Sequence, residues 1–209
     1  RDTTYVQLVL TCVYSGEQYI YNEPYGCAYM SREHTYCHAW MPTNPADDPE
    51  KPEYNDQHHL FPAQFENANQ VRLDYPLGEV VTPASTYLGC KIGQNANGKI
   101  VFEPRDAHKG DAARALFYMC TTYNGVSGNN WGLPNTSTRY QDQNILRKWH
   151  YQDPPSNYEM ARNEFLDSLQ GNRNPFIDHP EYACYINFQT MEYIAGATEP
   201  CNNTSIGMN

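Results

Sequence analysis

Apolar and polar residues alternate along several short stretches of the chain, which is the pattern of β-strands with one buried face. The first stretch covers residues 4–14, TYVQLVLTCVY. Two others are GEVVTPASTYLG at 78–89 and GKIVFEP at 98–104. The NANG sequence between Gln94 and Lys99 favours a tight turn that closes a β-hairpin. We therefore predict strands at these three places.

A helical spacing of apolar residues replaces the alternation in residues 111–124. Asp111 is placed to cap the N-terminus of this helix, and Arg114 lies on the face opposite the apolar residues. The apolar residues are Leu116, Met119, Cys120 and Tyr123.

A second helix is predicted over residues 157–170. The DPPS sequence comes before it, and Gly171 is the expected C-cap. We expect its buried side to carry Tyr158, Ala161, Phe165 and Leu169.

The residues between these elements predict one further helix and two loops. A strand is expected to stop at Pro62, and residues 63–72 then contain enough helix formers for a short helix. The proline-rich residues 41–55 and the residues 125–142, which are rich in Gly and Asn, predict loops.

Length and composition indicate one globular unit. At 209 residues the chain can form its own core, and no break in composition divides it. It contains no run of about 20 apolar residues, so we expect a soluble protein with no membrane partner. The chain starts at Arg1 without a visible signal peptide, which we interpret as a mature or trimmed form. We predict a single mixed α+β domain over residues 1–209, and a monomer.

Seven cysteines are scattered along the chain without a CxxC motif. This spacing argues against a zinc ribbon and is typical of disulfide-bonded proteins from an oxidising compartment. We expect Cys184 to pair with Cys201 and Cys90 with Cys120, although the spacing leaves the connectivity open. The odd count leaves at least one thiol free or paired outside the chain.

The net charge of −10 argues against broad electrostatic capture of nucleic acid and leaves room for a local basic cleft. Nine of the 14 basic residues are arginine. Arginine suits bidentate contacts with phosphate groups, so a small arginine-lined cleft on an acidic protein is compatible with this composition.

Residues 31–43, SREHTYCHAWMPT, place the carboxylate of Glu33 beside the imidazole of His34. A carboxylate can bind a hard divalent cation, and an adjacent imidazole can accept a proton from water. A zinc site on His34 and His38 is one alternative, but the HExxH motif has its Glu after the first His, whereas Glu33 precedes His34. A polar pair without catalytic function near a strand end is the other alternative.

Asn69 and Arg72 are three residues apart on the predicted short helix and are therefore neighbours. The neutral amide oxygen of Asn69 suits a Mg²⁺ shell that already holds one carboxylate and several waters. The alternative is an asparagine that caps a turn and an arginine in solvent.

Four motifs follow one another along the chain: SREHTYCHAWMP, then DQHHLFPA with Asn69 and Arg72 behind it, then KGDAARALFYM, then QGNRNPFIDHPE. Over roughly residues 20–185 the chain resembles the endonuclease I family. The members of this family are secreted or periplasmic nucleases with a ββα-metal, or His-Me finger, core. The resemblance implies the same core and the same localisation for this chain.

The resemblance also implies roles for individual residues. His34 takes the place of the general base, and Glu33 and Asn69 hold one Mg²⁺ ion, for which Mn²⁺ or Ca²⁺ are substitutes. Asn67 is a rival ligand, because the spacing from HHL to the asparagine is one residue longer than in the family pattern. Asn69 is preferred because it keeps an N-x-x-R step. Arg114 matches a family arginine near the phosphate.

Further arginines and asparagines are candidates for contacts with the substrate. Arg72 is expected to assist catalysis, and Arg32, Asn172 and Arg173 are expected to bind the substrate. Asn172 and Arg173 follow a predicted helix end, where a capping and turn role explains them equally well.

The remaining polar residues near the motifs have structural interpretations. Asp56, His58 and His59 are interpreted as braces of their loop, with contact to the metal or substrate as the alternative. We expect three further histidines, His108, His150 and His179, to lie on the surface.

These observations predict a secreted or periplasmic, Mg²⁺-dependent and largely sequence-nonspecific endonuclease. We expect DNA to be its main substrate and RNA to be an additional one. Water activated by His34 would attack the phosphodiester while the cation stabilises the phosphorane and the departing 3′ oxygen. The alternative is a nuclease-like binding or scaffold protein without catalytic activity, for which the acidic charge is the best support.

Overall fold

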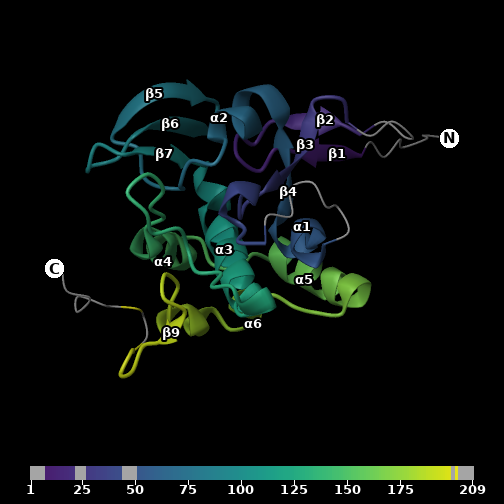
Figure 1. The fold of residues 1–209 in the computed structure, drawn as a ribbon. Coiled ribbons are helices and arrows are strands. Elements are labelled where there is room, and N and C mark those ends of the chain that lie inside the picture. The colour runs from purple at the N-terminus through teal and green to yellow at the C-terminus, as the bar shows by residue number, and fades with distance from the viewer. Residues whose placement is uncertain (1–7, 22–26, 44–50, 199–200, 202–209) are drawn as a thin grey trace.

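The computed structural model describes residues 8–21, 27–43, 51–198 and 201, which Figure 1 shows as a ribbon. Helices and strands pack around a shared hydrophobic core, which confirms the predicted mixed α+β class. The strands are β1 (Val9–Thr11), β2 (Gln18–Ile20), β3 (Met30–His34), β4 (Leu60–Gln64), β5 (Thr82–Tyr87), β6 (Cys90–Gln94), β7 (Ile100–Glu103), β8 (Ile186–Asn187) and β9 (Glu192–Tyr193). The helices are α1 (Pro52–Asn55), α2 (Gln70–Arg72), α3 (Lys109–Tyr123), α4 (Gln143–Gln152), α5 (Asn157–Gln170) and α6 (Pro175–Asp178).

The first predicted strand is a hairpin instead of one continuous strand. Residues 4–7 of the predicted stretch lie outside the described residues, and β1 ends at Thr11. A tight turn follows, in which the N–H of Gly16 donates to the carbonyl oxygen of Cys12 at 2.8 Å. Gly16 has a positive φ of 80° there, a conformation that glycine adopts without steric cost. β2 then pairs antiparallel with β1.

The second and third predicted strands belong to one three-stranded antiparallel sheet, β5-β6-β7. The prediction missed β6, which pairs with both neighbours. The NANG turn does close a hairpin, but the hairpin joins β6 to β7. The N–H of Gly98 donates to the carbonyl oxygen of Asn95 within this turn.

Strands β3 and β4 form a separate antiparallel pair, and a helical segment follows β4. The expectation that a strand stops at Pro62 is wrong, because Pro62 lies inside β4 opposite Arg32. Proline is tolerated there because β3 and β4 are each paired on one side only. The predicted short helix is confirmed as a π-helical turn, Phe65–Asn69, that continues into α2.

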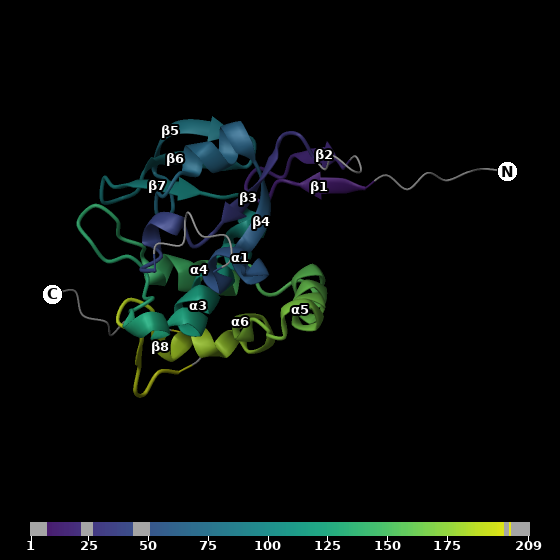
Figure 2. The ribbon, with the colours of Figure 1, turned by 45° about the vertical axis from the view of Figure 1, so that its right-hand side comes forward.

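Helix α3 lies between α4 and α5 in Figure 1, and Figure 2 shows it beside α4 and α6 after a turn of 45°. The predicted helix is confirmed, but it begins at Lys109, and no side chain caps its start. Asp111 therefore is not the N-cap, and its carboxylate instead binds Arg114 and His108. Because other elements surround α3, Arg114 is fully buried, and its expected outward position is wrong.

Helix α5 has the predicted bounds and caps but buries the opposite face from the one expected. Ser156 and Glu159 form a capping box at its start, and Gly171 ends it with φ 75°. The expected buried residues are exposed: Tyr158 by 71%, Phe165 by 63% and Leu169 by 61%; Ala161 is exposed as well. The buried residues are Glu159, Asn163 and Leu166, because the two polar side chains bind Arg114 and Asn174 inside the protein.

Several other expectations change in the structure. Residues 41–55 are not only a loop, because α1 forms near their end; residues 44–50 lie outside the described residues. His108 and His150 are buried, whereas His179 is exposed as expected. His150 is buried because it lies on α4, a helix that the sequence did not predict.

The two expected disulfides have different outcomes. Cys184 and Cys201 are bonded, which confirms that pair. Cys90 and Cys120 are separate buried thiols, so the second pair is wrong. The thiol of Cys90 instead donates to the carbonyl oxygen of Tyr87.

No helix within the described part of the chain combines the length and the apolar character that crossing a membrane requires.

Candidate active site

The end of β3 and the helical segment after β4 come together on one side of the molecule. β3 and β4 pair with His34 opposite Leu60 and Glu33 opposite Phe61. The segment that follows β4 folds back over β3, so that the side-chain amide of Asn69 donates to the hydroxyl of Ser31 at 2.8 Å. Residues 38 positions apart therefore meet, and this ββα unit positions Glu33, His34 and Asn69.

Glu33 is buried, and only one of its two carboxylate oxygens is occupied. Oε1 accepts hydrogen bonds from the hydroxyl of Tyr14 at 2.7 Å and from Nη1 of Arg72 at 2.6 Å. Burial raises the pKa of Glu33, and the nearby Arg72 charge opposes that shift. No described residue donates a hydrogen bond to Oε2, and Glu33 lines a cleft. Oε2 is therefore available to a ligand.

The amide of Asn69 has a defined orientation. Nδ2 donates to the Ser31 hydroxyl and, at 3.3 Å, to the carbonyl oxygen of Arg32. The Ser31 hydroxyl in turn donates to the carbonyl oxygen of Ala63, so both partners of Asn69 act as acceptors. Oδ1 of Asn69 is consequently left for a ligand. The rival Asn67 does not line the cleft.

His34 presents a neutral imidazole with one open nitrogen. Nε2 lies 2.9 Å from the carbonyl oxygen of Tyr54, which can only accept, so Nε2 carries the hydrogen. Nδ1 then has a free lone pair, and no described residue bonds to it. Burial, followed by the neighbouring His59 and His38, lowers the pKa of His34 to about 3. The ring is therefore unprotonated at neutral pH and can accept a proton.

Both terminal nitrogens of the Arg72 guanidinium donate to protein oxygens, whereas Nε has no partner among the described residues. Besides Glu33, Arg72 donates to the carbonyl oxygens of His34 at 3.0 Å and Thr35 at 2.7 Å. Its guanidinium also lies 5.4 Å from the centre of the Trp40 ring. Arg72 therefore holds the end of β3 and fixes the position of the Glu33 carboxylate.

A cleft of about 400 Å³ connects these groups. Arg32 is exposed at its edge, with its guanidinium 5.9 Å from the ring centre of Tyr54. No carboxylate within the described ranges forms an ion pair with Arg32. The cleft is lined by Arg32, Glu33, His34, Cys37, His38, Ala39, Asn69, Arg72, Leu73 and Asp74.

Comparison with known proteins agrees with this geometry. A sequence model of the Endonuclease I family matches residues 5–181. The chain belongs to the endonuclease I family. The unit formed by β3, β4 and the following helical segment is the His-Me finger core that membership in the endonuclease I family implies.

Curated relatives are nucleases from outside the cytoplasm. An extracellular ribonuclease of Bacillus subtilis (strain 168) is 37% identical over 154 residues, which cover 70% of this chain and 51% of the relative. One from Bacillus amyloliquefaciens is 40% identical over 136 residues, covering 61% and 45%. A periplasmic deoxyribonuclease of Aeromonas hydrophila is 31% identical over 123 residues, covering 59% and 47%. The chain thus spans about half the length of these relatives.

The zinc alternative lacks a ligand set. The rings of His34 and His38 are only 3.9 Å apart, but they meet edge to face. His38 instead stacks on Tyr54 at 4.6 Å. In the part of the chain that the structure describes, no group of three or more His, Cys, Asp or Glu side chains could hold a metal ion. A protein zinc site takes three or four such ligands.

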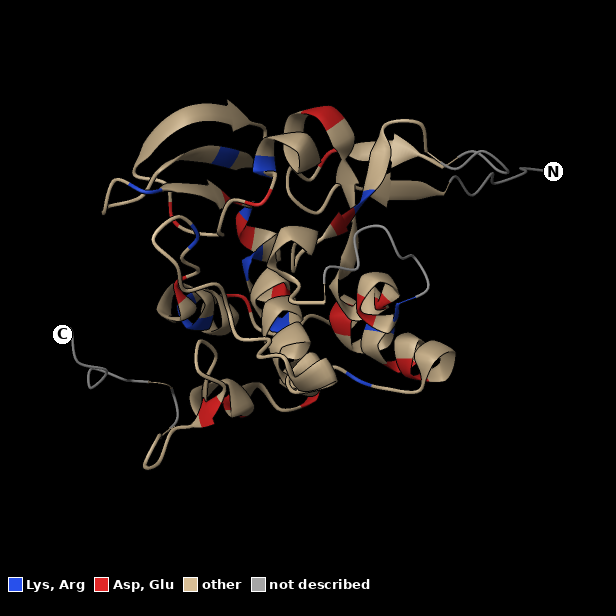
Figure 3. Cartoon of the chain, viewed as in Figure 1, with Lys and Arg blue, Asp and Glu red and all other residues tan. Residues whose placement is uncertain are grey.

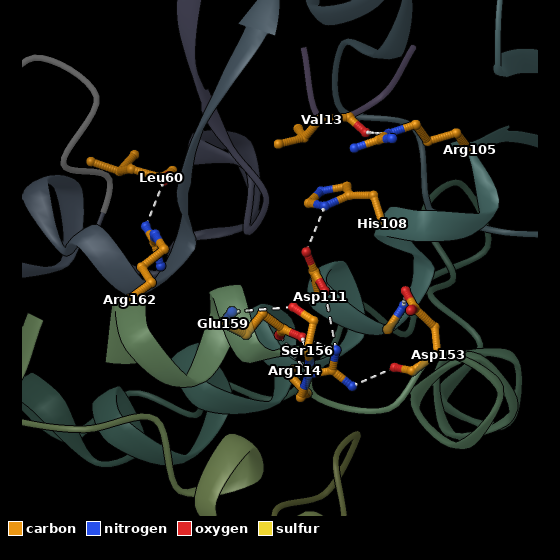
Figure 4. Close-up of polar contacts among 11 residues, drawn as sticks. Val13, Leu60, Arg105, His108, Asp111, Arg114, Asp153, Ser156, Glu159 and Arg162 are labelled. Atoms are coloured by element: carbon orange, nitrogen blue, oxygen red, sulfur yellow. Dashed lines mark hydrogen bonds and ion pairs between the residues drawn. The ribbon is translucent and has the colours of Figure 1, made fainter. Parts of the chain in front are cut away.

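The structure does not bring Arg114 to this cleft. Figure 4 shows it among the acidic residues Asp111, Asp153 and Glu159. Its Nε and Nη2 donate to the two carboxylate oxygens of Glu159 at 2.7 and 2.5 Å, and Nη2 also donates to Asp111. Nη1 donates to the carbonyl oxygen of Asp153 at 2.7 Å. Every donor nitrogen of Arg114 is thus used inside the protein.

Asn172 and Arg173 also lie outside the cleft. The amide of Asn172 donates to the Tyr118 hydroxyl at 2.6 Å and accepts from Gln170 at 2.8 Å. Arg173 pairs with Asp178 and Glu164 at the surface. Neither residue caps a helix, because Gly171 is the C-cap of α5 and Asn174 is the N-cap of α6.

Asp56 braces the segment before β4, as one of the two interpretations predicted. Its Oδ1 accepts from the N–H of His58 and from Gln170, and its Oδ2 accepts from the hydroxyls of Tyr118 and Tyr123. Four donors hold this carboxylate in place, so it ties the segment to α3.

Three contributors to the site were missed. Tyr14 reaches Glu33 from the turn after β1, and Tyr54 contributes only a backbone oxygen from α1. Leu73 is an exposed residue of the cleft wall with φ 49°, a conformation that costs a non-glycine residue of order 1–3 kcal/mol. A local sequence pattern offers no signal for contacts made through space or through a carbonyl group.

Proposed function

We propose that this chain is a secreted or periplasmic, divalent-cation-dependent endonuclease that hydrolyses the phosphodiester bonds of DNA and RNA. One observation carries the proposal: three residues that line the same cleft each have an acceptor atom to which no described residue donates. These atoms are Oε2 of Glu33, Oδ1 of Asn69 and Nδ1 of His34. The nuclease relatives, which are extracellular or periplasmic, support the activity and the localisation.

The donor set fits Mg²⁺, with Mn²⁺ or Ca²⁺ as substitutes. Glu33 and Asn69 would hold the cation through one carboxylate and one amide oxygen, which are ligands that hard cations prefer. Two protein ligands leave coordination positions for water and phosphate oxygens, which Mg²⁺ commonly keeps. A cation bound there supplies positive charge to the phosphorane and to the departing 3′ oxygen.

His34 would act as the general base. Nδ1 accepts a proton from the attacking water, while the hydrogen bond from Nε2 to Tyr54 keeps the ring in the required tautomer and orientation. The new phosphorus–oxygen bond forms as the bond to the 3′ oxygen breaks, and that oxygen takes its proton from solvent. The products carry a 5′-phosphate and a 3′-hydroxyl.

The two cleft arginines would have different functions. Arg72 would be a positioning residue, because its contacts hold Glu33 and the end of β3. Arg32 is exposed and faces the cleft without an acidic partner among the described residues, so it is placed to contact the phosphate. Figure 3 shows Lys and Arg positions dispersed among Asp and Glu positions along the described ribbon.

Water is the nucleophile in this mechanism, so the substrate needs no 2′-hydroxyl. DNA and RNA are therefore both expected to be cleaved, in keeping with a set of relatives that contains ribonucleases and deoxyribonucleases. A nuclease-like protein that only binds has no need for the three open acceptor atoms.

The proposal is tested by incubating the protein with plasmid DNA and with a single-stranded RNA, each with Mg²⁺ and with EDTA. Cleavage that EDTA abolishes, and that leaves 5′-phosphate ends, is expected on both substrates. His34→Ala should remove this activity. His179→Ala is the control, because it changes an exposed histidine that does not line the cleft, and it should retain the activity. Absence of EDTA-sensitive cleavage of either substrate contradicts the proposal.

A further inference from the structure

A second and larger hollow of about 700 Å³ adjoins the cleft. We name it the hairpin groove, because the β6–β7 turn forms one wall and the loop before α4 forms the other. Its volume falls in the range of small-molecule binding sites, about 300–1,000 Å³. It is lined by Tyr75, Pro76, Leu77, Gly78, Glu79, Val81, Asn95, Ala96, Asn97, Gly98, Lys99, Ile100, Val101, Thr136, Ser137, Thr138, Tyr140, Asp142 and Ile145.

Consecutive residues of the chain line the cleft and the hairpin groove. Asp74 lines the cleft and the next residue, Tyr75, lines the groove. A turn closed by the N–H of Tyr75 and the carbonyl oxygen of Arg72 at 3.0 Å carries the chain from one to the other. Leu73 exposes its side chain on this turn. A nucleic acid strand that leaves the cleft on this side would therefore meet the groove next.

A basic residue lies at the junction of the two hollows. Arg139 forms an ion pair with Asp74, and both side chains are partly exposed. Its neighbour Tyr140 lines the groove. A surface ion pair of this kind contributes little stability, so a phosphate group can replace Asp74 as the partner of Arg139.

The groove combines apolar walls with a few polar groups. Tyr140 is 49% exposed, and the side chains of Val81 and Ile100 are exposed beside it. No described residue binds the side-chain amide of Asn97 or the ammonium group of Lys99. The two acidic side chains at the rim are already engaged, since Glu79 pairs with Lys148 and Asp142 caps α4.

We propose that the hairpin groove binds one unpaired nucleobase of the substrate strand, next to the nucleotide whose phosphate lies in the cleft. This inference rests on the proposed nuclease function, since it assigns a part of the same substrate. A base stacks on a tyrosine ring and hydrogen-bonds to amide groups, and the groove offers both. Two observations favour a nucleotide over a protein segment or a second copy of this chain. The groove and the cleft are lined by consecutive residues, and the Arg139 guanidinium lies beside Asp74 of the cleft.

Binding of labelled oligonucleotides tests the inference without requiring catalysis. The probe is a fluorescein-labelled single-stranded hexadeoxynucleotide, measured by anisotropy in EDTA, together with versions that lack one base at each position in turn. Loss of a stacked base weakens binding by about 5- to 150-fold, so one position of the scan should show this loss. Tyr140→Ala should make all positions equal, and Tyr140→Trp should preserve the dependence.

Two further variants exclude an effect of misfolding. Ile100→Glu adds a negative charge to the opposite wall and should weaken binding of the intact probe but not of the version abasic at the sensitive position. Tyr193→Ala removes an exposed tyrosine from β9, outside the groove, and should behave as the wild type. Thermal unfolding of each variant verifies that it is folded.

The results separate this inference from the proposed function. If every abasic probe binds equally well, the proposal that the groove binds a base is wrong, even if the wild type cleaves all probes with Mg²⁺. Self-association that Tyr140→Ala abolishes, together with a flat scan, would overturn it in favour of a second copy of the chain. Position-dependent binding without any Mg²⁺-dependent cleavage supports the groove and contradicts the nuclease.

Discussion

Two buried arginine–glutamate pairs differ in how much of the carboxylate the arginine occupies. Arg72 and its partner form a pair beside the cleft, and only Oε1 of Glu33 is bound. Arg114 forms the other pair between α3 and α5, where it binds both oxygens of Glu159. Both arginines also donate to backbone carbonyl oxygens. The second pair is closed, whereas the first keeps one oxygen open toward a cleft.

This difference shows that burial and ion pairing alone do not identify a functional carboxylate. Both pairs are almost completely shielded from solvent. What separates them is the acceptor atom that remains unused. No described residue donates to Oε2 of Glu33, whereas Arg114 binds both oxygens of Glu159. We therefore expect changes around Glu33 to affect activity and changes around Glu159 to affect stability.

The largest effect is expected for His34→Ala. Loss of the general base should lower kcat by about 10²–10⁴-fold with Mg²⁺ present. The free energy of unfolding should change by only about 0.5–1.5 kcal/mol, because one hydrogen bond to Tyr54 is lost. Single-turnover cleavage and urea unfolding measure the two quantities. Wild-type kcat in this variant would place the chemistry elsewhere.

Arg114→Met should affect stability in place of activity. It leaves the carboxylate of Glu159 buried without its cation, which costs about 3–5 kcal/mol in the free energy of unfolding. Arg173→Met is the matched control, because its ion pairs lie at the surface, where such pairs contribute little stability. The kcat of the folded fraction should stay at the wild-type value in both. A fall in kcat without loss of stability in Arg114→Met would assign this arginine to the reaction.

Asn69→Ala should weaken cation binding with little effect on stability. The substitution removes one of the two proposed protein ligands. Loss of a group that only hydrogen-bonds to a metal ligand already lowers metal affinity by about 10- to 100-fold, so the affinity for Mn²⁺ should fall by at least this factor. Titration calorimetry measures this affinity. Asn67→Ala serves as the control and should bind Mn²⁺ as the wild type does, and the opposite order would make Asn67 the ligand.

Tyr14→Phe is expected to give the smallest effect. It removes one of the two hydrogen bonds to Oε1 of Glu33 and leaves Arg72 in place. The free energy of unfolding should fall by about 0.5–1.5 kcal/mol, with a change of only a few-fold in Mn²⁺ affinity. Denaturant unfolding and calorimetry measure both. An effect as large as that of Asn69→Ala would mean that the Tyr14 hydroxyl, and not Arg72, positions the carboxylate.

The sequence predicted the elements of the site better than their surroundings. Glu33 and His34 are adjacent in the chain, and Asn69 and Arg72 are one helical turn apart, so local spacing already relates the members of each pair. The family resemblance then related the two pairs to each other. Tyr14 could not be found in this way, because its contact with Glu33 depends on how the first hairpin packs.

The errors arose where packing overrides the local pattern. Arg114 was placed on an outer face because α3 looks amphipathic, but neighbouring elements cover the helix on every side. The buried face of α5 was assigned from its apolar residues, yet Glu159 and Asn163 point inward because Arg114 and Asn174 bind them there. Such long-range partners leave no periodic signal in the sequence.

A crystal structure of the protein with Mn²⁺, with the ion located by anomalous diffraction, tests the central claim most directly. We predict one ion in the cleft, bound to Oε2 of Glu33 and Oδ1 of Asn69 at about 2.0–2.2 Å, with water in the remaining positions. His34 should lie nearby without coordinating the ion, its Nδ1 facing one of those waters. An ion held by His34 and His38, or an ion bound away from Glu33, would contradict the account.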